Sequence, residues 1–217
     1  MNTTKPLKGL LLYFLYLAGW KLAILYLQVI AWGIAFLMFG HTILHFIFGV
    51  NAVAGATLLI ITGMGNKEID WERFQLSMPV KRSDLVRSQY LSAGLASLIG
   101  IPIFVIFTGL SSIWHDGISF TLLSVFLSIT PFLSAPFILS GLLFPLASIR
   151  ALENKVDGLY ALLMLLSFAI PQGVSAGAYR LGGQSMVVAS SFMLAISFAI
   201  FIVSYFITKK MYAKLDF

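Results

Sequence analysis

The sequence contains no cysteine, so neither a disulfide framework nor a thiolate site for a metal ion or redox chemistry is available. Charge is scarce as well: 10% of the 217 residues are charged and 59% are hydrophobic, whereas ordinary soluble domains have about 25% charged residues. Apolar stretches of about 20 residues, long enough to cross a hydrocarbon layer about 30 Å thick, recur along the chain. This composition indicates an integral membrane protein.

Several functional motifs are missing. We expect no acidic side chain inside the membrane. Proton- or sodium-coupled carriers usually need ionisable or carbonyl-lined sites there, so this absence argues against a carrier of that class. The chain has no H-E-x-x-H motif and no aspartate pair or Ser–His dyad at span depth, which argues against an intramembrane protease. A Walker loop is absent too, because "GMGNKE" lacks the spacing and the hydroxyl of that motif. We therefore predict no enzyme activity, catalytic residue, metal ion or cofactor in this chain itself.

Hydropathy predicts an all-α polytopic membrane protein, with residues 1–217 forming a single transmembrane domain. The six predicted transmembrane helices cover about 19–39, 41–64, 88–114, 119–147, 159–176 and 186–208. The fourth span contains three prolines, each of which removes a backbone donor, so it predicts a kinked, tilted or broken helix.

The N-terminal stretch predicts an interfacial helix over about 6–18. Its Lys8, Tyr13 and Tyr16 suit the headgroup level of a bilayer. No small-residue cleavage signature follows the basic start and the apolar run, so we expect this segment to be retained.

The basic residues predict the orientation, because Lys and Arg near span ends stay on the cytoplasmic side. If the N- and C-termini are both cytoplasmic, all of the 14 basic residues except Arg180 face the cytoplasm. The net charge of +6 then reflects cytoplasmic loops and contact with anionic lipid. We expect no nucleic-acid partner, since no basic, aromatic-interleaved soluble module is present.

One polar segment, residues 67–90, interrupts this apolar chain with nine charged side chains. Within it, Trp71, Phe74 and Met78 share the spacing of one helix face, and Pro79 ends that short helix. An amphipathic helix of this kind either lies on the headgroups or inserts into a groove on a soluble partner.

A second helix is expected to follow directly. Ser83 is its predicted N-cap. The Asp84 carboxylate in the first turn would interact favourably with the positive end of the helix dipole. This helix would lead into the third span.

The stretch "WERFQLSMPVKRSDLVRSQYL" resembles the first cytoplasmic loop of bacterial type-two ABC transporter permeases. The family pattern matches Trp71, Phe74, Leu76, Ser77, Pro79, Arg82, Val86 and Tyr90. Met78 replaces the usual leucine, and Lys81 stands where a small hydroxyl residue is common. The layout is similar as well: an interfacial helix, six spans, and both ends in the cytoplasm.

The resemblance implies a permease subunit, most often of an exporter, in the bacterial cell membrane. Such permeases pair with a separate ATPase subunit, which binds ATP and Mg, and with a second permease that is a copy or a paralogue. Loop 65–87 would be the coupling segment. Its contacts with the ATPase would come from Asp70, Trp71, Glu72, Arg73, Phe74, Met78, Pro79 and Arg82. The chain looks most like exporters of phenol-soluble modulins and related antimicrobial peptides, which implies amphipathic peptide cargo.

Other polar residues leave alternatives open. Gln28 and Asn51 are the deepest polar residues of the first two spans, and they either contact substrate or join helices by hydrogen bonds. His41 and His45 have a spacing that can share a metal, although an external polar rim explains them as well. The alternatives for the whole chain are a secondary carrier, a bacteriocin-immunity protein, or an ABC exporter of drugs or lipids.

Overall fold

The computed structural model describes residues 4–40, 42–55, 81–114, 121–147 and 156–214. These residues are almost entirely helical, and no strand occurs among them. The elements are α1 (Thr4–Phe39), α2 (Thr42–Gly49), the π-helix η1 (Val50–Ala54), α5 (Arg82–Trp114), α6 (Leu122–Ala147), α7 (Val156–Leu181) and α8 (Gly183–Lys214).

Within the described ranges, four helices, α5, α6, α7 and α8, are long and apolar enough to cross a membrane. A shorter apolar helix, Ala23–Phe39, forms the second part of α1. The prediction of an all-α, multi-pass membrane protein is therefore confirmed. The count of six spans and the cytoplasmic termini stay predictions, and most of the second predicted span lies outside the described residues.

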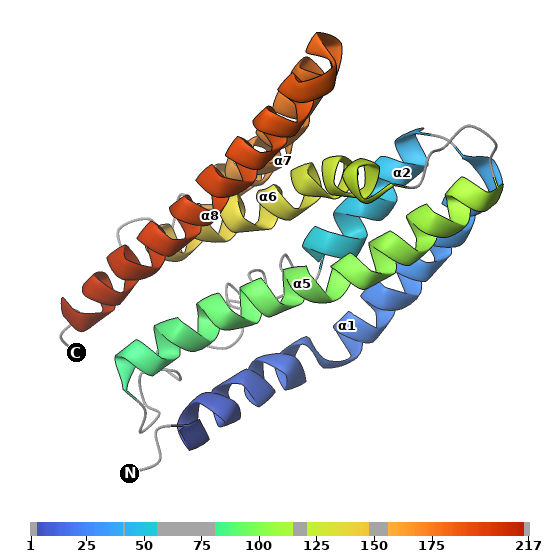
Figure 1. Ribbon diagram of the computed structural model, residues 1–217. Coiled ribbons are helices and arrows are strands. Elements are labelled where there is room, and N and C mark those ends of the chain that lie inside the picture. Colours follow the sequence, from blue (N-terminus) through green and yellow to red (C-terminus); the bar gives the residue numbers. More distant parts are fainter. Residues whose placement is uncertain (1–3, 41, 56–80, 115–120, 148–155, 215–217) are drawn as a thin grey trace.

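The helices extend past the predicted span ends. α5 begins at Arg82, six residues before the predicted start at Ser88, and α8 continues to Lys214 beyond residue 208. Hydropathy detects the apolar part of a helix, whereas the backbone hydrogen bonds continue into the polar residues beyond it. α1 likewise joins the predicted interfacial segment and the first span in one helix, which changes direction partway in Figure 1.

α6 is helical throughout, although it contains Pro131, Pro136 and Pro145. Of the expected alternatives, a broken helix is therefore wrong. The Thr130 hydroxyl donates to the Phe126 carbonyl at 2.6 Å, and the Ser140 hydroxyl donates to the Pro136 carbonyl. Membrane helices tolerate proline because neighbouring hydroxyls and helices compensate for the disturbed backbone.

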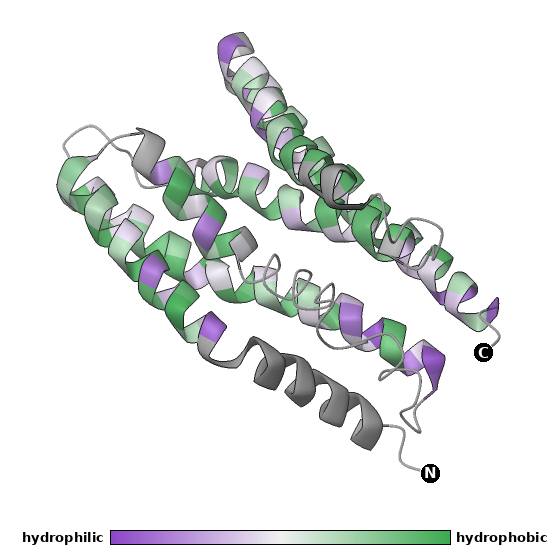
Figure 2. Ribbon diagram, turned by 180° about the vertical axis from the view of Figure 1, so that it is seen from behind, coloured by the Kyte–Doolittle hydropathy of each residue, from purple (hydrophilic) through white to green (hydrophobic). Residues whose placement is uncertain are grey.

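The helices form two groups (Figure 1). α1, α2 and η1 pack with α5, whereas α6 packs with α7 and α8. A buried apolar cluster joins the groups, because it includes Phe48 of α2, Phe104 of α5 and Phe132 of α6. Hydrophobic residues cover most of the helix surfaces, and hydrophilic residues gather where α5 begins and α8 ends (Figure 2).

α5 crosses η1 at unusually close range. A Cβ atom built on Gly100 would lie 1.7 Å from the Ala52 carbonyl oxygen, so only glycine fits at this crossing. The π-helix is defined here by a hydrogen bond from the Gly55 N–H to the Val50 carbonyl. The two backbones therefore touch directly in the middle of the first group.

Candidate functional site at the junction of α5 and α8

Arg82 is the only one of the eight predicted coupling residues that the structure describes, and the other seven lie outside the described residues. Arg82 opens α5, and its Nη1 donates a hydrogen bond to the Tyr212 carbonyl of α8 at 3.1 Å. The last of the predicted contact residues is thus attached to the final turns of α8. The remaining predicted contacts stay predictions.

The first turn of α5 is organised by backbone hydrogen bonds. The Lys81 carbonyl accepts the N–H groups of Asp84 at 2.8 Å and Leu85 at 3.2 Å. Ser83, the predicted N-cap, instead lies within the first turn of the helix. Asp84 lies in this turn as expected, where a carboxylate stabilises the positive end of the helix dipole. The first turn of α5, at the end of the predicted coupling segment, is therefore held by its own backbone hydrogen bonds.

Tyr90 connects α5 to α8 two turns further on. Its hydroxyl lies 2.5 Å from the Ser204 Oγ and 2.8 Å from the Thr208 Oγ1. All three side chains are buried. Ser204 and Thr208 are four residues apart, so they lie on the same face of α8, one turn apart.

Aromatic rings surround the Tyr90 hydrogen bonds. The Tyr90 ring lies 4.7 Å from Phe144 of α6, 5.1 Å from Phe201 and 5.5 Å from Tyr205, both of α8, between centroids. These distances fall in the range where tilted and edge-to-face pairs attract each other. The same buried cluster includes Leu85. Three helices, α5, α6 and α8, therefore meet around one tyrosine.

This junction is suited to holding helices together. In the described part of the chain, no group of three or more His, Asp or Glu side chains could hold a metal ion.

Sequence reasoning noted Tyr90 only as part of a family pattern, and it missed Ser204, Thr208 and Tyr212. The available signal was the i, i+4 pair of hydroxyls, Ser204 and Thr208, near the end of an apolar helix.

The two predicted substrate residues lie on different elements. Gln28 is exposed on α1. Asn51 lies in η1, and its Nδ2 donates to the Ile47 carbonyl one turn back at 2.8 Å. Their role as a substrate pathway stays a prediction.

His45 lies among aromatic rings, 5.0 Å from Phe36 and 5.2 Å from Phe104 between centroids. Its predicted neighbour His41 lies outside the described residues. The alternative of a metal shared by these two histidines therefore stays a prediction.

A family model described as "ABC-2 family transporter protein" matches residues 9–213. The chain belongs to the ABC-2 transporter family. Comparisons with curated proteins and with solved structures gave no match. As an ABC-2 permease, the chain is a multi-pass membrane subunit of a transporter, and family membership implies a separate ATPase partner. The resemblance of the loop sequence to type-two ABC permeases is confirmed for the family.

Proposed function

We propose that this ABC-2 permease is the transmembrane subunit of an ATP-driven exporter, and that its ATPase engages loop 65–87. The observation that carries this proposal is the continuity of α5, which begins at Arg82, the last of the predicted contact residues. A helix of 33 residues is about 50 Å long at 1.5 Å per residue. Motion of the loop is therefore passed on to a helix long enough to cross the membrane.

The ATPase contacts would be made by the aromatic face of the loop, with Trp71 and Phe74 as anchors. Buried aromatic side chains commonly dominate the binding energy of an interface. The partner would bind ATP and Mg and hydrolyse the ATP, with no catalytic residue in this chain. Closure of the ATPase would then move the loop and tilt α5.

The favoured cargo is an amphipathic peptide of the phenol-soluble-modulin kind, and the favoured assembly is a pair of permease copies with two ATPases in the bacterial cell membrane. The exporter resemblance supports this choice of cargo. Hydrophobic residues predominate along the described helices, which also suits a cargo with one apolar face (Figure 2).

Transport into inverted membrane vesicles tests the function. The vesicles come from cells that express the permease with its ATPase, and the probe is a fluorescently labelled amphipathic helical peptide. We expect uptake with ATP and none with a non-hydrolysable analogue. Equal uptake without hydrolysis would exclude an ATP-driven exporter. Uptake of a labelled lipid or drug in place of the peptide would exclude the proposed cargo alone.

The W71A/F74A variant tests the coupling segment in the same vesicles. We expect ATP-dependent uptake to be lost while membrane insertion remains normal. Trp114→Ala is the matched control, because this exposed tryptophan ends α5 at the opposite end from the loop. Full uptake by the W71A/F74A variant would contradict the proposed role of the loop.

A further inference from the structure

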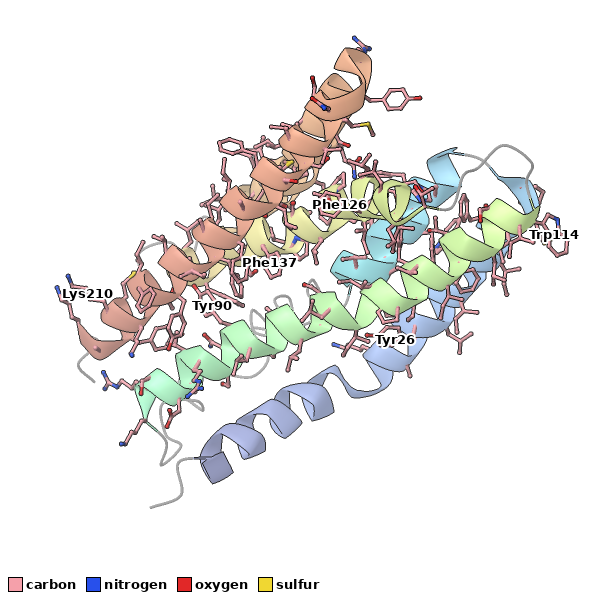
Figure 3. The ribbon with its side chains drawn as sticks, viewed as in Figure 1. Tyr26, Tyr90, Trp114, Phe126, Phe137 and Lys210 are labelled. Atoms are coloured by element: carbon pink, nitrogen blue, oxygen red, sulfur yellow. The ribbon has the colours of Figure 1, made fainter. Side chains whose placement is uncertain are left out.

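We propose that Tyr90 is a positioning residue that fixes the end of α8 to the start of α5, so that both helices respond together when the coupling segment moves. This inference rests on the proposed function, because it assigns a second output to the same segment. Figure 3 shows Tyr90 in the region where α5 faces α8, toward the end of α8 that carries Lys210.

The hydrogen bonds form a regular antiparallel set. Arg82 bonds to Tyr212, and Tyr90 bonds to Thr208 and Ser204. The partners on α8 are spaced by four residues each, so they lie on three successive turns of one face. As the residue numbers increase along α5, those of the bonded residues decrease along α8. The two helices are therefore held in a defined register over their first and last turns.

The phenol hydroxyl has one proton, so it donates to one of its two partners and accepts from the other. Ser204 is 3% exposed and Thr208 is fully buried. Water therefore has no access to replace these bonds, and a buried polar group that loses its partner in the membrane is costly. Separating the ends of α5 and α8 would break both bonds at once.

Beyond this end, the two helices pack against different elements. Further along, α5 packs against η1 at Gly100, whereas α8 packs against α6, where Gly141 lies close to Ile200. Figure 1 shows α5 and α8 diverging toward their other ends. Because α5 belongs to one helix group and α8 to the other, the Tyr90 contacts transmit motion of the loop to both groups.

Paired spin labels test this attachment in the purified permease alone. The chain has no native cysteine, so cysteines placed at the exposed positions Leu95 on α5 and Val203 on α8 accept the labels specifically. We expect one narrow distance distribution in the parent protein and a broader one in Tyr90→Phe, which keeps the ring and loses only the hydroxyl. Tyr179→Phe, a change at an exposed tyrosine of α7, is the matched control and should leave the distribution unchanged.

The S204A/T208A variant tests the same bonds from α8. We expect it to broaden the distribution as Tyr90→Phe does, and adding Tyr90→Phe should cause no further change. Additive effects, or a Tyr90→Phe distribution as narrow as that of the parent, would overturn the inference. If Tyr90→Phe fails to fold, the S204A/T208A distribution alone decides the question.

Transport per ATP in the complex tests the mechanical role. In vesicles with the labelled peptide, we expect Tyr90→Phe to keep its ATP hydrolysis while uptake per ATP falls between about threefold and tenfold, as two interhelical hydrogen bonds allow. An unchanged ratio would overturn the mechanical role. Failure of the proposed function can be distinguished from failure of this inference. In the first case, uptake would not require the ATPase at all, whereas the label distances in the permease alone would still report on Tyr90.

Discussion

Gly100→Ala is expected to destabilise the protein more than any other single methyl addition at the described glycines. The added Cβ would lie 1.7 Å from the Ala52 carbonyl oxygen, 2.5 Å from its carbonyl carbon and 2.9 Å from the Val53 Cα. A carbon and a carbonyl oxygen ordinarily approach to about 3.3 Å, so the two helices must separate by about 1.6 Å. All three neighbouring atoms belong to the backbone of η1, so no side-chain rotation can relieve the clash.

Overpacking of a well-packed core costs about 1–3 kcal/mol, and a clash with backbone lies at the upper end of this range. The helix propensity of alanine offsets about 0.5–1 kcal/mol of the loss. We therefore expect a net loss of about 2 kcal/mol, which lowers the melting temperature by about 4–8 °C for a chain of this size.

Thermal unfolding in detergent, followed by tryptophan fluorescence, measures this effect. Gly94→Ala is the matched control, because Gly94 lies on the same helix and a Cβ there meets nothing within 4 Å. The control should match or exceed the parent in melting temperature, because only the gain in helix propensity remains. The close crossing of α5 and η1 would be refuted if Gly100→Ala were as stable as Gly94→Ala.

Three further changes are tested by the same unfolding assay. Gly33→Ala should cost less than Gly100→Ala, because the three atoms nearest its Cβ all belong to the ring of Phe107, which can move; an equal loss would contradict this. Phe104→Ala removes a fully buried ring at the joint between the helix groups and should cost about 3–5 kcal/mol, whereas a comparable loss at the exposed Phe192 would argue against this core. Ser134→Ala should be neutral or stabilising, since the buried Ser134 hydroxyl has no hydrogen-bond partner in the described structure, and a clear loss would reveal one.

Much of the fold was predictable because membrane thickness constrains the length of an apolar helix. The predicted spans 88–114, 119–147, 159–176 and 186–208 each correspond to one apolar helix, α5, α6, α7 and α8. The ends of these helices were less predictable. No hydropathy signal marks where a helix such as α8 stops once it has left the apolar layer.

The contacts between helices were not predictable in the same way. The closeness of Gly100 to η1 depends on which helices cross, and the π-helix at Val50–Ala54 has no motif in the sequence. The partners of Tyr90 lie more than 110 residues away, on α8. A single sequence contains the hydroxyl residues but gives no indication of which helix faces which.

Affinity purification of the tagged chain from its native membrane tests most directly whether a separate ATPase drives it. We predict that a soluble protein with a Walker loop co-purifies with the parent chain and with Trp114→Ala, and that the W71A/F74A variant loses it while keeping normal membrane insertion. Purification of the chain without any such protein, together with ATP-independent transport of the labelled peptide, would contradict the proposed function.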